Sequence, residues 1–332
     1  MAGWQSVDST AIEAYRWQEG VLALRFAENA QVYEYPCDEA LLARFLGAES
    51  KGAFVNRVLK PLEQRARTRA QFALQSRTFE SSGYLFTDER ILGWISSHTD
   101  VRREDRILDV AGGTGALGRY LLRSAASCVV MDLVPEMLAA GPKQRDVLYV
   151  LGDATAMPFA SGQFDLLVSR FAVHHFDDPA AVFREMTRVG VPGARVVVID
   201  MVDGGARHNE LERLRDPSHT SALSETTLLS LLADAGITAS VAAEREHTMD
   251  AARWLSQAHG DREPVEAALQ AEAQGGPPTG LHARLVNNAL QITQRWVILA
   301  GTAGQGLEPQ LPEPESGVLP ITPPGKGAGR AV

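Results

Sequence analysis

From about residue 79 onward, short aliphatic runs alternate with stretches of helical period. The runs are each 4–6 residues long and lie at 106–110, 128–132, 148–151, 164–169 and 195–200. Near-continuous apolar strands that are separated by helices form a parallel sheet covered on both faces. Residues 78–303 are therefore expected to form an α/β domain with a doubly wound, mostly parallel, Rossmann-like sheet.

The first sixty residues follow a different pattern, in which strands come directly after one another. Three strands are predicted, at 12–17, 21–26 and 31–35. The second strand alternates apolar and other residues, as a sheet with one buried face requires. Asp38 is placed to cap a helix that carries four large apolar residues. We predict a small α+β domain over residues 1–62.

Two further segments complete the predicted organisation. Residues 63–77 are basic and rich in Ala and Gln, which predicts a helical linker. Residues 304–332 are rich in Gly and Pro and have little to bury, which predicts a disordered tail.

Composition changes this picture little. The chain has 332 residues, of which 45% are hydrophobic and 22% charged, so a full core can be buried. Its two cysteines, Cys37 and Cys128, lie far apart without ligand spacing, which disfavours a metal site and a disulfide framework. No apolar run of about 18 residues occurs and Met1 begins no leader, so we expect a cytoplasmic protein without a membrane segment.

Charge is unevenly distributed along the chain. The formal net charge of −9 disfavours non-specific binding to a phosphate backbone. Residues 51–77, however, contain seven Lys or Arg residues and one Glu. This segment is either a solvated helical connector or a landing site for an acidic peptide or an RNA.

A strand that enters a glycine-rich turn and then a helix is the central chemical signal. Residues 107–115 read ILDVAGGTG, and a helix is predicted over 116–124. Residues without a Cβ allow positive φ or close approach of the backbone to a ligand. The helix N-terminus that follows offers free N–H groups and a positive dipole end. Alone this is weak evidence, because many such junctions need glycine only for packing.

Acidic residues follow the next two strands. Asp132 ends the second strand, 19 residues after Gly113, where its carboxylate can accept hydrogen bonds from vicinal ribose hydroxyls. The third strand ends in Gly152-Asp153-Ala154, where an adenine amine can donate to the carboxylate. Ligands of open α/β sheets bind along this carboxyl edge, and three matched strand ends are hard to obtain by packing alone.

These residues resemble the class I S-adenosylmethionine-dependent methyltransferases. The D-V-A-G-G-T-G turn is similar to the ubiquinone/menaquinone-biosynthesis type (methyltransferase type 11), and the M-P-F and Q-F-D segments at 157–159 and 163–165 resemble that family's entry to strand four. The resemblance covers roughly residues 78–303. It implies S-adenosylmethionine as cofactor and S-adenosylhomocysteine as product. A nicotinamide cofactor is disfavoured, because the turn does not satisfy G-x-G-x-x-G.

The same resemblance implies roles for individual residues. Asp109 and Gly113 are expected to line the methionine portion of the cofactor. Asp132 is expected to hold the ribose, and Asp153 with the Ala154 backbone N–H to recognise the adenine.

Three further residues complete the cofactor site that the resemblance implies. Ser169 and Arg170, at the end of strand four, are expected beside the methionine and the sulfonium, and Tyr84 resembles a lid residue. The full expected set is Tyr84, Asp109, Ala111, Gly113, Gly115, Asp132, Leu133, Gly152, Asp153, Ala154, Ser169 and Arg170.

Histidines supply the candidate catalytic bases. Methyl transfer is an in-line displacement at an activated carbon, so the protein mainly aligns the nucleophile and removes its proton. His174 and His175 follow strand four, and His219 ends a segment, 209–219, that resembles a sub-branch of small-molecule methyltransferases. The alternatives are that the pair simply begins a helix and that His219 is a structural ion-pair partner.

The N-terminal segment resembles the KTSC domain found at the end of some lysyl-tRNA synthetases. The resemblance rests on the strand sequence Y-E-Y at 33–35 and on S-K-G-A-F-V-N at 50–56. A functional interpretation makes Tyr33, Tyr35, Lys51 and Asn56 a recognition patch that stacks bases or captures a peptide strand. The alternative is that the tyrosines pack a small sheet.

Three functions are compatible with the sequence. The first is a methyltransferase for a small-molecule or peptide natural product (N-, O- or C-methylation), with the front domain assisting recognition. The second is an RNA (tRNA) methyltransferase whose front domain binds RNA. The third is a cofactor-binding protein that does not transfer methyl groups. The second is weakened because S-R-F-A, at 169–172, replaces the Asn/Asp-Pro-Pro-Tyr motif of amine methylation in nucleic acids.

Overall fold

The computed structural model describes residues 3–28, 30–82, 84–257 and 259–304, with side chains at all of them except 81, 82, 84 and 85. The chain divides into two compact units, residues 1–68 and 69–332, and the division falls within helix α3 (Lys60–Gln75). Of the predicted tail, only Gly304 lies within the described residues. No helix in the described ranges is both long and apolar enough to cross a bilayer.

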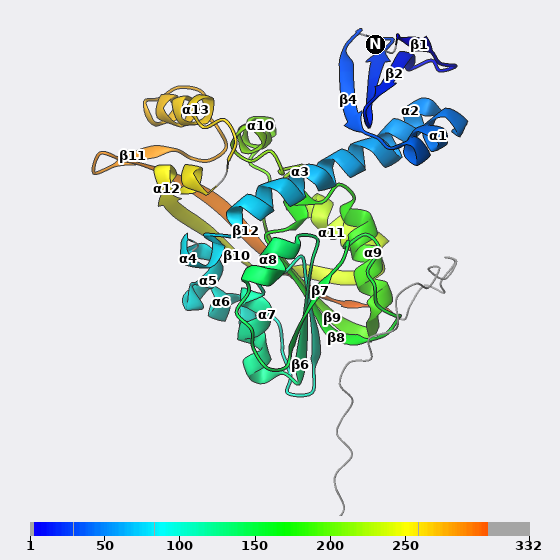
Figure 1. Ribbon diagram of the computed structural model, residues 1–332. Helices are drawn as coiled ribbons and strands as arrows, with labels where there is room; N and C mark the ends of the chain where they lie inside the picture. The colour runs from blue at the N-terminus through cyan, green and yellow to red at the C-terminus, as the bar shows by residue number, and fades with distance from the viewer. Residues whose placement is uncertain (1–2, 29, 83, 258, 305–332) are drawn as a thin grey trace, which may run out of the picture. The chain divides into compact units, whose positions relative to one another are not determined.

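The first unit is built on a four-stranded antiparallel sheet, drawn in blue in Figure 1. The strands pair in chain order: β1 (Gln5–Ser6), β2 (Ile12–Gln18), β3 (Val21–Phe26) and β4 (Val32–Pro36). The last three lie within one residue of their predicted positions. Alternation places Leu22 and Leu24 on the buried face, where they join Ile12, Phe45 and Leu59 in one core.

Helices complete this unit. Asp38 caps α1 (Glu39–Gly47) as predicted, and its carboxylate accepts the Leu41 N–H at 2.7 Å. Helix α2 (Lys51–Phe54) continues through a π-helical turn (Val55–Leu59) into α3. Pro61, which has no backbone N–H, follows directly after this π-helical turn, and the helix continues past it.

The second unit has the predicted doubly wound α/β fold (Figure 1). Its main sheet has the order β10-β12-β9-β8-β5-β6-β7, and the short β11 pairs with β12. Strands β5 to β9 are parallel, whereas β12 runs antiparallel to β9 and β10. The strands are β5 (Arg106–Val110), β6 (Ser127–Asp132), β7 (Val147–Leu151), β8 (Phe164–Arg170), β9 (Gly190–Met201), β10 (Ile237–Asp250), β11 (Arg284–Val286) and β12 (Ala289–Ala303).

Helices cover both faces of this sheet. One core packs the sheet against α6, α7, α10, α12 and α13, and the other packs it against α9 and α11. The helices are α4 (Phe79–Ser82), α5 (Tyr84–Thr87), α6 (Glu89–Ser96), α7 (Ala116–Leu121), α8 (Pro135–Ala140), α9 (Pro179–Val189), α10 (Ala206–Arg215), α11 (Glu225–Asp234), α12 (Ala251–Ser256) and α13 (Glu263–Ala273). Short 3-10 turns occupy Leu122–Ser124 and Val173–His175.

Strand direction decides which segments surround the carboxyl edge of the sheet. Since β12 is antiparallel to both β9 and β10, β10 is parallel to β9. The insertion between β10 and β12, residues 251–288, therefore leaves the sheet at the same edge as the ends of β5 to β9. Helix α10, which follows β9, leaves from this edge as well.

The core of the first unit depends on Phe45. Its side chain is fully buried and packs edge-on against the rings of Tyr15 and Phe54. We expect Phe45→Ala to destabilise this unit by about 3–5 kcal/mol, through lost burial and a residual cavity. Native-state hydrogen exchange of the β2–β4 amides in the full chain measures the loss. Leu46→Ala, at a position 39% exposed on the same helix, is the control, and an equal loss there contradicts the assignment.

Candidate functional site

The glycine-rich turn is held by the protein's own side chains. Asp109 is buried at the end of β5, and its carboxylate accepts the Gly118 N–H at 2.8 Å, so it anchors the first turn of α7. Gly115 has φ +80°, and a Cβ there would lie 2.8 Å from a Val130 methyl group. Ala111 takes φ +52°, a left-handed conformation that costs a non-glycine residue roughly 1–2 kcal/mol. The turn is thus a fixed structure whose backbone shape is determined by packing.

Asp132 connects the second strand to this turn. One carboxylate oxygen accepts the Gly113 N–H at 2.8 Å, and the other accepts the Val134 N–H at 2.9 Å. Burial raises the pKa of Asp132 to about 6, against the opposing effect of these backbone donors. A carboxylate has about four acceptor positions, so two remain for hydroxyl groups of a ligand.

The third strand end is less tightly constrained. One Asp153 carboxylate oxygen accepts both the backbone N–H and the hydroxyl of Thr155, which shapes a tight turn. Gly152 donates its N–H to the Asp132 carbonyl, and Ala154 and Leu133 are half-buried. These residues lie along one edge, as the sequence predicts. The side chain of Tyr84 lies outside the described residues.

Ser169 and Arg170 do not lie on the same side of the sheet. Val168 belongs to the core with α6 and α7, and Leu167 to the core with α9, so alternation places Arg170 with the former and Ser169 with the latter. The expectation that both lie beside the methionine and the sulfonium of a cofactor stays a prediction. The Ser169 hydroxyl is buried and has no hydrogen-bond partner among the described residues.

Arg170 shares a buried site with Asp109. Burial lowers the pKa of Arg170 to about 10, whereas the Asp109 carboxylate favours its charge. Burial raises the pKa of Asp109 to about 6, and Arg170 opposes that rise. The guanidinium donates to the Phe86 carbonyl at 3.1 Å, which ties helix α5 to the end of β8. The following residue, Phe171, has φ +50°, so the chain turns sharply at this point.

The three candidate histidines form one buried cluster. The His174 ring lies 4.1 Å from that of His175 and 5.5 Å from that of His219, centroid to centroid. His174 Nδ1 lies 2.6 Å from an Asp200 carboxylate oxygen, and the other oxygen accepts the His174 backbone N–H. Nδ1 therefore carries the proton in the neutral ring, and the Nε2 lone pair is left for another group.

His175 has a different environment. Its Nδ1 lies 3.1 Å from the Ser218 carbonyl, which can only accept, so Nδ1–H is the donor. The Ser218 hydroxyl donates in turn to Asp216 at 2.5 Å. Burial, followed by the neighbouring His174 charge, lowers the pKa of His175 to about 4. For His174, burial also opposes the charge, but Asp200 outweighs it and the net effect raises the pKa. Opposite shifts of adjacent rings separate a base from a neutral neighbour.

His219 is held in the interior by hydrogen bonds. Its Nε2 lies 2.9 Å from the Asn209 side-chain oxygen, and that oxygen also accepts the Ala222 N–H at 2.7 Å. Burial and the His174 charge lower the pKa of His219 to about 2, so the ring is neutral. This geometry matches a structural role for His219 better than a catalytic one.

Sequence reasoning did not single out Asp200. The carboxylate is 2% exposed at the end of β9, where its oxygens bind His174 and the Met201 N–H. The available signal was the same as for Asp132, an acidic residue at the end of an aliphatic strand. Among the described residues, no three His, Cys, Asp or Glu side chains are grouped so that they could hold a metal ion.

The four residues proposed for a recognition patch belong to the first unit. Tyr35 is 2% exposed, and burial is the main reason that its pKa is raised to about 12. Lys51 is also buried, and its ammonium donates to a backbone carbonyl. Tyr33 and Asn56 are exposed. The expected patch of four side chains is not formed, because two of them lie in the interior.

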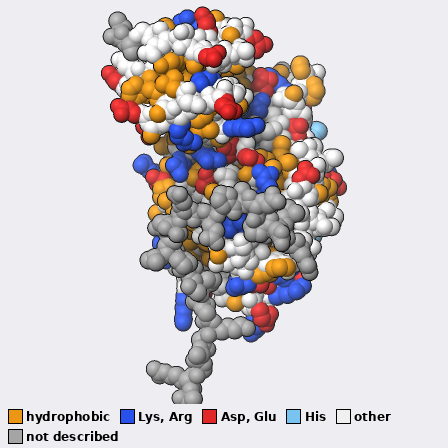
Figure 2. Space-filling model, turned by 90° about the vertical axis from the view of Figure 1, so that its right-hand side faces the viewer, with side chains coloured by type: hydrophobic (Ala, Val, Ile, Leu, Met, Phe, Trp, Pro, Cys, Tyr) orange, Lys and Arg blue, Asp and Glu red, His pale blue; other side chains and the backbone are white. Residues whose placement is uncertain are grey.

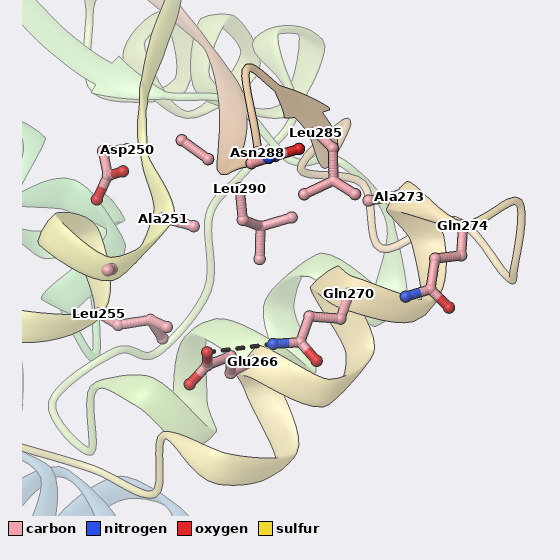
Figure 3. A pocket seen from close by; sticks show the side chains of 12 residues that line it. Asp250, Ala251, Leu255, Glu266, Gln270, Ala273, Gln274, Leu285, Asn288 and Leu290 are labelled. Carbon is pink, nitrogen blue, oxygen red and sulfur yellow. Dashed lines mark hydrogen bonds between the residues drawn. The ribbon is translucent and has the colours of Figure 1, made fainter.

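A separate pocket of about 420 Å³ lies among α12, α13 and the β11–β12 hairpin (Figure 3). Asp250, Glu266, Gln270 and Asn288 are among its polar lining residues, and Glu266 accepts a hydrogen bond from Gln270 at 3.2 Å. None of the residues expected to bind cofactor or act as a base lines this pocket.

The His174–Asp200 pair predicts a pH dependence. Since Asp200 raises the pKa of His174, Asp200→Asn should lower that pKa, because burial is then opposed only by the smaller effects of Glu212 and Asp216. The stabilisation from this pair is complete below pH 6.5 and is lost as pH rises through the folded-state pKa. Titration of the imidazole resonances by NMR measures the change. Glu210→Gln, an exposed change on α10, is the control, and an unchanged His174 pKa in Asp200→Asn contradicts the pairing.

Part of this chain is similar to known methyltransferases. Residues 108–198 match the sequence family Methyltransf_11, described as a methyltransferase domain. The chain is 46% identical over 96 residues to a demethylmenaquinone methyltransferase of Mycolicibacterium vanbaalenii, a match that spans 29% of this chain and 42% of the relative. It thus spans less than half the length of this relative.

Two further matches extend over more of the chain. The uncharacterized methyltransferase YcgJ of Bacillus subtilis is 29% identical over 168 residues, which cover 44% of this chain and 66% of YcgJ. The crystal structure of the YcgJ protein superposes with a TM-score of 0.60 at 20% identity and covers 66% of this chain and all of that one. The second unit therefore has a Rossmann-like methyltransferase fold, and residues 108–198 within it match a methyltransferase domain.

Proposed function

We propose that this chain binds S-adenosylmethionine at the carboxyl ends of β5 to β7 and transfers its methyl group to a small-molecule or peptide acceptor. The observation that carries the proposal is the buried Asp132 carboxylate, tied to the turn through Gly113 with acceptor positions to spare. A carboxylate at the end of the second strand of such a fold is suited to a ribose with two adjacent hydroxyls.

The residues along this edge fit the cofactor. Gly113 and Gly115 keep side chains out of the turn, and the half-buried Asp153 and Ala154 offer an acceptor and a backbone donor for an adenine. Asp109 stabilises the glycine-rich turn, since its carboxylate accepts a hydrogen bond from the backbone of α7. When bound, the cofactor supplies an electrophilic methyl group on a sulfonium.

His174 is the residue we propose as general base. Asp200 fixes its tautomer and orientation, so that Nε2 is available to take a proton from the acceptor. The carboxylate also stabilises the imidazolium that forms when the proton arrives. His175 stays neutral beside it and does not compete for that proton. Turnover is expected to fall as pH drops below the pKa of His174, because the base is then already protonated.

The structure favours a small acceptor over an RNA. The demethylmenaquinone methyltransferase relative is named for a small molecule, which supports this choice. The RNA hypothesis was drawn from the basic segment 51–77 and from an aromatic and basic patch in the first unit, and within that patch Tyr35 and Lys51 are buried. We therefore propose an assisting role in acceptor recognition for the first unit, residues 1–68, rather than RNA binding.

Asp132→Ala tests cofactor binding. The change removes two charge-assisted acceptors, each worth about 1.5–3 kcal/mol, so affinity should fall at least about 100-fold. Calorimetry with S-adenosylhomocysteine measures it. Glu136→Ala, on α8 close to the site, should leave the affinity unchanged. An unaltered affinity in Asp132→Ala removes the ribose assignment.

Deletion of residues 1–59 tests the role of the first unit while leaving α3 whole. The first unit has its own core, so the deletion should leave the affinity for S-adenosylhomocysteine unchanged. Methyl transfer to an acceptor found by screening metabolites with the full chain should fall. If cofactor affinity is lost as well, the first unit is structural rather than an aid to recognition.

A further inference from the structure

One side of helix α3 in the second unit is buried and polar. The Gln71 and Gln75 side chains are only 5% and 9% exposed, and residues four apart lie on the same face of a helix. Phe72 lies on the adjoining part of that face, given 100° of rotation per residue. Amphipathic helices usually bury apolar side chains, so two buried carboxamides need a reason.

Phe72 shows what this face covers. Its ring packs edge-on against the His175 ring, with 4.9 Å between centroids. His175 in turn lies against His174. The Thr220 hydroxyl donates to the His174 carbonyl at 2.7 Å, so the loop after α10 borders the same pair. Phe72, which adjoins the two carboxamides on α3, is therefore separated from the proposed base by the His175 ring.

The Gln71 amide nitrogen is buried and has no hydrogen-bond partner in the described part of the chain. Leaving a buried amide donor unpaired costs about 1–3 kcal/mol, and native proteins rarely do so without a reason. The Ser76 hydroxyl, just beyond the end of the same helix, has a partner and donates to the Ala73 carbonyl at 2.8 Å. The Gln71 side-chain amide can therefore donate a hydrogen bond to an acceptor atom of a ligand.

Charge around the histidine pair limits what that acceptor atom can be. The carboxylates of Asp200 and Asp216 are buried here, and the Arg215 guanidinium is held at 2.8 Å by Glu212. An anionic ligand group would meet these carboxylates, while the neighbouring Arg215 is already paired with Glu212, which is unfavourable in a buried site. A neutral carbonyl oxygen accepts from the Gln71 amide without this penalty.

We propose that Gln71 is a specificity residue that donates to a neutral carbonyl oxygen of the methyl acceptor, next to the hydroxyl that His174 deprotonates. The acceptor class is then a small hydroxy-carbonyl compound, such as an acylphenol. In the reaction, the hydroxyl proton moves to His174 Nε2, the oxygen forms the new bond to the methyl carbon, and the carbon–sulfur bond breaks with its electron pair passing to sulfur. This inference rests on the proposed function.

A pair of matched ligands tests it. 3-Hydroxyacetophenone and 3-ethylphenol are similar in size, but only the first has a carbonyl oxygen. Their affinities are measured by calorimetry on the full chain saturated with S-adenosylhomocysteine. In the wild type, the ketone should bind about tenfold more tightly, because the other ligand leaves the Gln71 donor unpaired. In Gln71→Leu, the two affinities should become equal.

Control variants separate this role from a general effect on folding. Leu74→Ala, 55% exposed on the same helix, should retain the tenfold preference. Gln71→Glu keeps the shape of the side chain but replaces the donor by a carboxylate, and should lose the preference. Unchanged binding of S-adenosylhomocysteine in each variant shows that the fold is intact.

Each outcome bears on one proposal. Equal affinities in the wild type, absence of binding by either phenol, or a preference that survives in Gln71→Leu overturns the role of Gln71. Failure of the wild type to bind S-adenosylhomocysteine overturns the proposed function instead. Methylation of the ketone but not of 3-ethylphenol, followed by mass spectrometry, supports both.

Discussion

The hydrogen bond between the Asp132 carboxylate and the Gly113 N–H joins the two strands on which the site depends. It fixes the end of β6 to the turn after β5, while Asp109 fixes the same turn to α7. Both carboxylates are buried, and their raised pKa values show that burial opposes their charge. Backbone N–H groups and, for Asp109, Arg170 compensate part of the free-energy cost of burying these charges.

A buried carboxylate at a strand end also fixes a loop elsewhere along the carboxyl edge. Asp200 ends β9 and binds the backbone and the ring of His174, so an acidic residue at a strand end again fixes a loop. The surroundings then differentiate two adjacent imidazoles, one beside Asp200 and the other beside the Ser218 hydroxyl. In the proposed function, the strand end that holds the cofactor and the strand end that holds the base are therefore built in the same way, by an acidic residue that binds the following loop.

The strands that form this edge were predictable because they are buried on both faces. Strands β5 to β8 are aliphatic runs, and their predicted bounds are close to the observed ones. Strand β10 was missed, because its buried and exposed residues alternate and it contains charged residues. The long β12 was also missed, although it contains a buried apolar run, Trp296-Val297-Ile298-Leu299, of the kind that identified β5 to β8.

Side-chain environments were less predictable than backbone positions. Sequence reasoning expected the three histidines near an acceptor, but only the fold shows that Asn209 holds His219 and that Asp200 binds His174. Gln71 is the extreme case, since nothing in a basic, Gln-rich helix distinguishes a buried carboxamide from a solvated one. The proposed role of Gln71 depends on the neighbouring Phe72, whose ring packs against His175. In the proposed function, recognition of the acceptor thus depends on tertiary contacts, whereas recognition of the cofactor depends on strand ends that the sequence alone predicts.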